Sequence, residues 1–233
     1  MIKYKNIRGW TLKKIIIFRI AILSIFLALV LIFDFISKFL KISFFTVELT
    51  TIFIFVFFVN INIVDGFVLI FLRFLLKVFV TGDTDLLTNL IGNVILLISN
   101  LTFIFTYLLF MKIFRKKDTN FVLKTIISFV CSVIITSLVM SLLNTFIFNS
   151  LYFYSFKLLE RPSLSLLLEN YQSKFKGYFL GINNYFLGSL AIYLSFNLFN
   201  GFIIFIISLP VIIWEHKTGF IKNFIKLHKE TKY

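Results

Sequence analysis

Residues 186–214, the last long apolar stretch of the chain, read FLGSLAIYLSFNLFNGFIIFIISLPVIIW. It is long and apolar enough to cross a bilayer as one helix, because a span needs about 20 predominantly apolar residues. Two amides, Asn197 and Asn200, lie three residues apart within it and are followed by Gly201. That spacing places both amides on one helix face, and an amide left unpaired in lipid is costly. We therefore expect both amides to contact a polar partner, either a neighbouring helix or a bound ligand.

Apolar stretches of this kind recur along the whole chain, which has 233 residues and is 60% hydrophobic, with a mean hydropathy of +1.00. This composition predicts an integral membrane protein that folds as a single all-α domain over residues 1–233. The stretches predict six transmembrane helices, at about residues 15–36, 49–64, 66–80, 86–110, 121–148 and 186–214. The first is too long for the core of a typical signal peptide, so we expect it to be retained.

The formal net charge of +14 comes mainly from basic clusters that flank the apolar stretches. These clusters lie at the N-terminus, between Lys112 and Lys124, and between Lys217 and Lys232. Basic flanks are typical of cytoplasmic loops and tails, so the charge predicts membrane topology rather than binding to nucleic acid. The N-terminus and the cluster at Lys112 are both cytoplasmic only if an even number of spans separates them. This condition favours a helix break within residues 60–66.

That topology places both termini in the cytoplasm and three connections outside, at residues 38–48, 81–85 and 149–185. The last connection is long and polar enough to be hydrated, and it contains the helix-breaking sequence ERP at residues 160–162. A loop of this length is either a functional lid or a disordered segment, and the sequence leaves both open.

Sequence patterns of enzymes are absent from the chain. It has no G-x-x-x-x-G-K-[ST] loop, so we do not expect it to hydrolyse ATP. Both histidines, His216 and His228, lie in the C-terminal tail, and no H-E-x-x-H motif or carboxylate cluster lies within a span. Cys131 is the only cysteine, so no disulfide framework exists. We expect no catalytic residues, no metal and no cofactor; an enzyme would need catalytic groups from residues 149–185.

Four short stretches follow one another along the chain. They read LKISFFTVEL at residues 40–49, TGDTDLLTNLIG at 81–92, NTFIFNSLY at 144–152 and SFNLFNG at 195–201. Together they resemble the motifs of S components, the substrate-binding subunits of energy-coupling-factor (ECF) vitamin transporters. The riboflavin-binding branch shows L-K-I-D-F, T-G-x-x-G-E-L-x-N-x-I-G, N-x-F-x-x-x-P-x-Y and P-F-N-x-x-K-G in this order. The resemblance covers about residues 40–201 and implies a six-helix, multi-pass S-component fold in the cell membrane.

The resemblance implies that a vitamin is captured from outside the cell by these stretches. The implied substrate contacts are Asn144, Asn197, Asn200, Tyr152, Lys41, Thr81 and Gly82. From the topology, we expect the three asparagines to lie at similar depth near the outer face. Asn200 stands where the riboflavin branch has a lysine, so riboflavin and another vitamin such as folate both stay open. The alternative is a structural or assembly membrane protein whose amides only join helices.

Two further charges lie one turn apart in the short third span, Arg73 and Lys77. Charges within a span mark function by default, so the pair could bind the anionic group of a vitamin such as folate. The alternatives are that the side chains reach the membrane surface, or that they pair with Asp34 or Glu48.

An S component needs other chains for transport. The resemblance implies a membrane coupling subunit and two ATPase subunits, which together drive uptake with ATP. It also implies a docking surface on the first span, a stripe of small residues formed by Ala21, Ser24 and Ala28. Their spacing lets helices approach closely, and packing within the chain is the alternative role.

Overall fold

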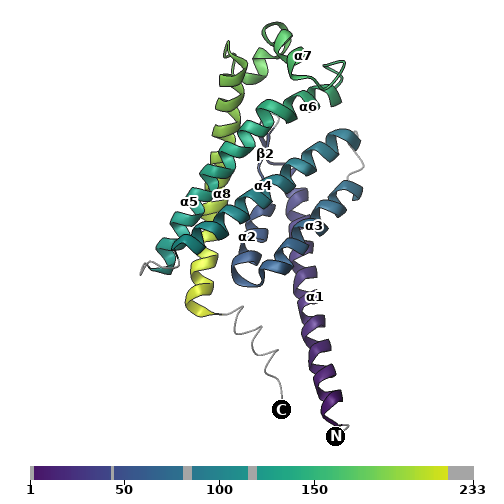
Figure 1. Ribbon diagram of the computed structural model, residues 1–233, viewed down its shortest axis with the longest axis vertical. Coiled ribbons are helices and arrows are strands. Elements are labelled where there is room, and N and C mark those ends of the chain that lie inside the picture. Colours follow the sequence, from purple (N-terminus) through teal and green to yellow (C-terminus); the bar gives the residue numbers. More distant parts are fainter. Residues whose placement is uncertain (1–2, 43–44, 81–85, 115–119, 220–233) are drawn as a thin grey trace. The chain divides into compact units, whose positions relative to one another are not determined.

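The computed structural model describes residues 3–42, 45–80, 86–114 and 120–219, and its chain divides into two compact units. The first unit comprises the residues up to Arg73 and those from Ile206 onward, and the second comprises Phe74–Phe205. Figure 1 shows the elements of both units, coloured along the sequence. Apart from one short hairpin, the described residues form helices, turns and connecting segments, in agreement with the predicted all-α class.

The first unit contains α1 (Lys3–Ser37), β1 (Lys41–Ile42), β2 (Phe45–Thr46), α2 (Thr50–Asn60) and the start of α3 (Ile63–Val80). The hairpin of β1 and β2 was not predicted. It is closed by a hydrogen bond from the Val47 N–H to the Leu40 carbonyl (3.0 Å). At its base the Leu49 N–H donates to Ser37 Oγ (3.3 Å), which ties the start of α2 to the end of α1.

The first unit has a helix break at Ile61 and Asn62, within the range where the sequence analysis expects one. Asn62 caps α3, because its Oδ1 accepts from the Val64 N–H (3.0 Å). Asp65 lies in the first turn of α3, where a negative charge interacts favourably with the helix dipole, and it forms an ion pair with Arg19 of α1. The capping asparagine therefore explains why residues 49–80 do not form one helix.

The second unit contains α4 (Leu86–Ile113), α5 (Phe121–Leu143), the π-helix η2 (Asn144–Phe148), α6 (Asn149–Ser155), α7 (Leu164–Glu169), η3 (Tyr171–Phe175), η4 (Lys176–Phe179) and most of α8 (Tyr185–Thr218). Asn120 caps α5 by accepting from the Val122 N–H (3.1 Å). α4 and α5 are antiparallel and pack along each other. The buried residues of α5 include Ser128 and Ser132, whose small side chains let the two helices approach closely.

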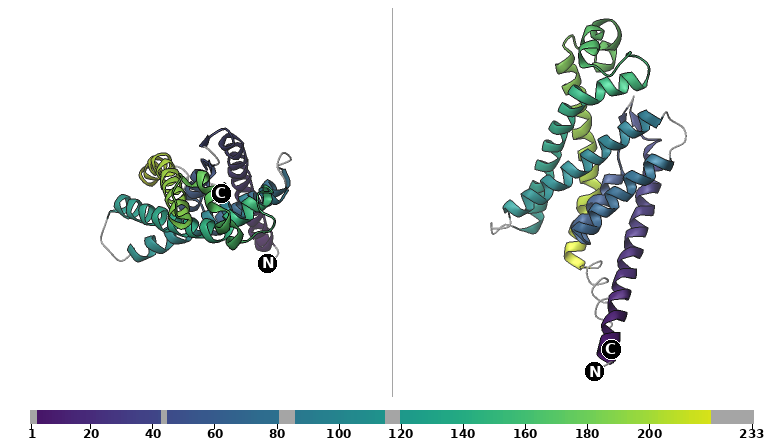
Figure 2. Two further views of the ribbon diagram at one scale, coloured as in Figure 1. Left: turned by 90° about the horizontal axis from the view of Figure 1, so that it is seen from above. Right: turned by 45° about the vertical axis from the view of Figure 1, so that its right-hand side comes forward.

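Residues 156–184, which we call the cap, fold into short helices and turns between α6 and α8 (Figure 2). Phe175 of the cap stacks on Phe153 of α6, with ring centroids 4.3 Å apart. Tyr171 Oη donates to the Ile182 carbonyl (2.7 Å), and burial raises the pKa of this hydroxyl. An aromatic cluster and side-chain hydrogen bonds therefore stabilise the fold of the cap.

The end of the fifth predicted span and the structure of the connection after it differ from the sequence prediction. The helical stretch that begins at Phe121 continues to Ser155, because η2 and α6 follow α5 without a break. The first seven residues of the predicted 149–185 connection are therefore helical, and the rest is folded rather than disordered. The apolar part of α1, Ile16–Ser37, agrees with the first predicted span at about residues 15–36, and the helix itself begins at Lys3.

Within the part of the chain that the structure describes, four helical stretches are long and apolar enough to cross a membrane, at Ile16–Ser37, Leu86–Ile113, Phe121–Ser155 and Tyr185–Thr218. α2 has only 11 residues, about 16 Å of helix against a hydrocarbon core of about 30 Å. α3 has 18 residues but carries Asp65, Arg73 and Lys77. The structure thus supports a protein with several membrane-spanning helices, while the count of six and the orientation of the termini remain predictions.

Candidate functional site

Side chains at every fourth position of α8 form a ridge that contacts α5 and the two helical segments that continue it, η2 and α6. The ridge consists of Tyr185, Ser189, Tyr193, Asn197, Gly201 and Phe205. Its contacts include the pairs Ser189–Thr145, Gly201–Val133 and Phe205–Phe129. The hydroxyl oxygens of Ser189 and Thr145 are 2.7 Å apart. A Cβ added to Gly201 would clash with Val133, and the ring centroids of Phe205 and Phe129 are 5.2 Å apart. Each step of four along α8 matches a step of four backwards along α5, so the helices are antiparallel in one register (Figure 1).

This register fixes the levels of the predicted asparagines. It places Asn197 opposite Ser137 and Asn144 opposite Leu190, which separates the two amides by about 10 Å along the helices. The expectation of similar depth is therefore wrong for this pair, because the helical stretch that begins at Phe121 continues to Ser155 and α8 packs against it in this register. Asn200 is half-buried and lies close in level to Asn197, away from the ridge.

Asn149 lies at the centre of a buried hydrogen-bond network between α6 and α8. Its Nδ2 donates to Tyr185 Oη (3.0 Å) and to Ser189 Oγ (3.0 Å), and its Oδ1 accepts from Tyr193 Oη. Tyr185 Oη donates to the Thr145 carbonyl (2.5 Å). The π-helix η2 contains this carbonyl, and such turns make carbonyls available because they interrupt the regular α-helical bonding. The side chain of Asn149 is therefore fully used in joining helices.

Asn197 lies two turns beyond Ser189 on the α8 ridge, and its hydrogen bonding differs from that of Asn149. Its Nδ2 is buried and has no hydrogen-bond partner in the part of the chain that the structure describes. On α5, Thr136 is next to Ser137; it is 8% exposed, and its Oγ1 also lacks a partner among those residues. A buried donor without an acceptor costs about 1–3 kcal/mol, so such atoms mark positions where a further group could bind.

Two other quoted stretches meet in the second unit. Tyr152 of α6 is half-buried, and its ring stacks on Phe156 with centroids 6.0 Å apart. Its Oη would lie 3.3 Å from a Cβ added to Gly92 of α4, so the stretches at 81–92 and 144–152 are in contact there. Asn144 is the first residue of η2 and is 6% exposed.

The remaining predicted residues are placed only in part. Lys41 belongs to β1, and its side chain lies outside the described part of the structure. Thr81 and Gly82 lie outside the described residues. The predicted docking stripe is exposed on α1 and consists of Ala21, Ser24 and Ala28.

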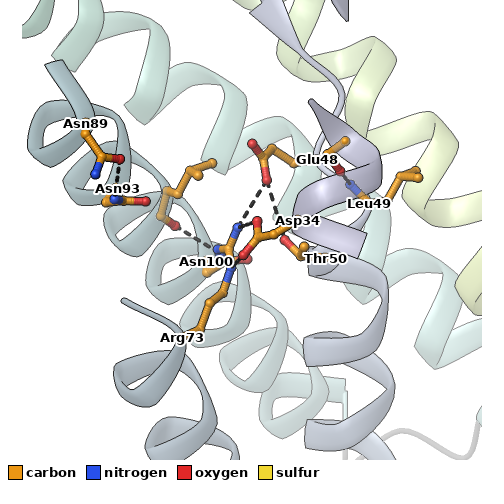
Figure 3. A network of polar contacts seen from close by, with 10 residues as sticks. Asp34, Glu48, Leu49, Thr50, Arg73, Asn89, Asn93 and Asn100 are labelled. Carbon is orange, nitrogen blue, oxygen red and sulfur yellow. Dashed lines mark hydrogen bonds and ion pairs between the residues drawn. The ribbon is translucent and has the colours of Figure 1, made fainter. Parts of the chain in front are cut away.

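The first unit holds a buried ion cluster (Figure 3). Arg73 of α3 binds both oxygens of Asp34 of α1, at 3.0 Å from Nε and 2.7 Å from Nη2. Its Nη2 also donates to Glu48 Oε2 (3.2 Å), which in turn accepts from Thr50 Oγ1 (3.4 Å). Arg73 is 4% exposed. The expected alternative of pairing with Asp34 or Glu48 is confirmed for Arg73, which binds both; Lys77 is half-buried in the last turn of α3.

Neither Asn149 nor Thr136 is among the site residues expected from the sequence. The sequence of α8 holds a signal for Asn149: polar side chains recur at a spacing of four, at Tyr185, Ser189 and Tyr193. All three bond to Asn149 in the structure. No signal marks Thr136, because α5 carries many hydroxyl side chains at helical spacing. Among the described residues, no group of three or more His, Cys, Asp or Glu side chains could hold a metal ion.

Comparison with known families assigns the chain. Residues 18–212 match the model of the family described as ECF transporter, substrate-specific component. Comparisons with curated proteins and with solved structures give no match. The family match spans the four quoted stretches, the α5–α8 ridge and the ion cluster. Because it covers most of the chain, the protein belongs to the family of substrate-specific components of ECF transporters.

Proposed function

We propose that this protein captures riboflavin or a chemically related vitamin from outside the cell and delivers it to an ATP-driven ECF module. Family membership supports a role in substrate recognition. The observation that carries the proposal is the buried Nδ2 of Asn197, which has no partner among the described residues although its helix is apolar enough to span a membrane. An acceptor atom of a ligand would satisfy this donor.

The proposed site combines apolar walls with a few amides. Apolar side chains would hold the ring system of the vitamin, and the amides would fix its orientation. The proposed contacts in the second unit are Asn144, Asn197, Asn200 and Tyr152, and the sequence resemblance adds Lys41, Thr81 and Gly82. A molecule that contacts both Asn144 and Asn197 must extend over about 10 Å, which favours a vitamin with several fused or linked rings over a single ring.

The ion cluster bears on the choice of vitamin. Arg73 is bound by two carboxylates, so the guanidinium is not an open site for the carboxylate of an anionic vitamin. This favours a neutral flavin over folate. Folate stays as the alternative, because Asn200 replaces the lysine that the riboflavin branch shows at this position.

The proposed topology has six spans in the cell membrane, with both termini in the cytoplasm. Transport requires a membrane coupling subunit and two ATPase subunits. We propose that the coupling subunit docks on the exposed face of α1 formed by Ala21, Ser24 and Ala28, where small side chains permit close helix packing.

The experiment is equilibrium binding of the purified full-length protein to riboflavin, folate and further vitamins. The expected result is binding at about micromolar concentration or tighter, weakened by Asn197→Ala and by Asn144→Ala. Bound vitamin should also raise the melting temperature of the wild type but not that of Asn197→Ala.

Two results would contradict the proposal. One is the absence of binding to every vitamin tested at micromolar concentration. The other is a melting temperature that falls in Asn197→Ala and does not respond to vitamin in either protein, which would assign the amide to helix assembly.

A further inference from the structure

We infer that Thr136 is a ligand contact that acts together with Asn197 and selects vitamins with a hydrogen-bond acceptor at this level of the site. This inference rests on the proposed function, and it adds a residue that none of the four quoted stretches contains. Its basis is the hydroxyl of Thr136, which lacks a hydrogen-bond partner among the described residues. This hydroxyl lies at the level of the Asn197 amide, whose Nδ2 also lacks one.

Other hydroxyls of the same helix show what Thr136 does not do. Serine and threonine within a helix usually satisfy their hydroxyl by donating to the carbonyl three or four residues earlier. Ser132 donates to the Ser128 carbonyl (2.6 Å), Ser141 to the Ser137 carbonyl (2.6 Å), and Thr145 to the Ser141 carbonyl (2.8 Å). Thr125, Ser128 and Thr136 are buried in α5 without a hydroxyl partner among the described residues, and Thr136 is the one of these three that lies at the level of Asn197. Its hydroxyl is therefore available to a group that does not belong to α5.

The position of Thr136 follows from Phe129, seven residues earlier on the same face of α5. The ring of Phe129 contacts Phe103 of α4 and Phe205 of α8, with centroids 5.2 Å away in both cases. Thr136 therefore faces the region between α4 and α8, two turns further along α5. The α5–α8 register brings Asn197 to this level, opposite Ser137.

The chemistry of the two groups defines the ligand edge. The Nδ2 of Asn197 can only donate, and the hydroxyl of Thr136 can both donate and accept. A carbonyl oxygen or an aromatic ring nitrogen can receive a donor from each side chain, and an adjacent ring N–H can donate to the hydroxyl. A purely apolar ring edge would leave both polar groups unsatisfied, and the site should reject it.

The test compares Thr136→Val, which replaces the hydroxyl by a methyl group of similar size, with Ser132→Ala as a matched control. Ser132 is also fully buried, but its hydroxyl is already bonded within α5. Binding of riboflavin and folate is measured for the purified full-length proteins. For the vitamin that binds the wild type, Thr136→Val should weaken binding about tenfold. Thr136→Ser, which keeps the hydroxyl, and Ser132→Ala should stay within about twofold of the wild type.

A double-mutant cycle distinguishes a shared ligand edge from separate effects. If both side chains bind one edge, Thr136→Val should weaken binding less in the Asn197→Ala background than in the wild type. Thr136→Ala serves as the second variant if the valine protein does not fold.

The possible outcomes distinguish the role of Thr136 from vitamin capture itself. If the wild type binds a vitamin and Thr136→Val binds it equally well, the role of Thr136 is overturned while vitamin capture stays intact. The same holds if Ser132→Ala weakens binding as much as Thr136→Val does. A wild-type protein that binds no vitamin would overturn the proposed function, and the role of Thr136 with it.

Discussion

The two units bury polar groups in opposite ways. In the first unit, Arg73 uses its guanidinium on Asp34 and Glu48, so charged groups that lipid would penalise are paired within the chain. In the second unit, the α8 ridge begins with side chains that are bonded to Asn149 and ends its polar part with Asn197, whose Nδ2 has no described partner. The paired groups hold helices together, and the unpaired group is the better candidate for ligand recognition. Polarity inside a membrane helix thus identifies a site only after the hydrogen bonds have been assigned.

The largest effect should come from breaking the ion cluster. Arg73→Met leaves the carboxylates of Asp34 and Glu48 buried without their cation, and it should lower the free energy of unfolding by about 3–5 kcal/mol. Denaturation of the protein in detergent measures this change. Arg19→Met is the control, because Arg19 is half exposed in its pair with Asp65 and should contribute less than about 1 kcal/mol. Equal effects of both substitutions would remove the distinction between buried and exposed pairs.

The comparison between paired and unpaired amides can be made within the second unit. Asn149→Leu leaves the hydroxyls of Tyr185, Ser189 and Tyr193 without this partner and should lower the free energy of unfolding by about 2–3 kcal/mol. Asn197→Leu removes a buried donor that has no described partner, so in the absence of vitamin the free energy of unfolding should stay the same or rise by up to about 1–3 kcal/mol. Thermal unfolding of the two variants measures the contrast. A similar loss in both would show that Asn197 also serves to join helices.

The α5–α8 register can be tested by filling the space at Gly201. A methyl group there would clash with Val133, so Gly201→Ala should lower the free energy of unfolding by about 1–3 kcal/mol. Adding Val133→Ala should restore part of this loss, because the smaller side chain makes room. Gly177→Ala is the matched control, since a Cβ at Gly177 meets no atom within 4 Å. A register different from the one described would leave Gly201→Ala harmless or the double variant no better.

The smallest effect should come from the cap. Burial raises the pKa of Tyr171 above its ordinary value of 10.0, so the folded state disfavours the phenolate. The corresponding stability is present below pH 10 and is lost as the pH rises, because only the unfolded chain then ionises readily. Melting curves between about pH 8 and about pH 11 should show a steeper loss for the wild type than for Tyr171→Phe, by under about 1 kcal/mol. Parallel curves for the two proteins would contradict this assignment.

Several features could be predicted from local chemistry alone. Apolar stretches identified the helices, and residues 60–66 were expected to interrupt them, which Asn62 does by capping α3. The partners of Arg73 were also predictable, because few carboxylates lie in or beside the apolar stretches. The levels of Asn144 and Asn197 were not, because they depend on where α5 ends and on how α8 packs against it. The fifth span was expected to end at Phe148, because polar residues that are typical of a loop follow it, whereas Asn149 is bonded to α8 and the helical stretch continues to Ser155.

The π-helix η2 can absorb a change in residue count that an α-helix cannot. Its five residues, Asn144–Phe148, form a wider turn than an α-helix, which in effect inserts one extra position. Deleting one of the five would let the segment close into a regular α-helix, and the later side chains would keep nearly the same direction, with Asn149 toward α8 and Tyr152 toward Gly92. Deleting a residue from the regular turns of α5 would instead rotate every later side chain by about 100° around the axis. Two deletions that preserve helicity and hydropathy equally can therefore keep or erase the contacts of α6, depending on whether they fall within the π-helix or before it.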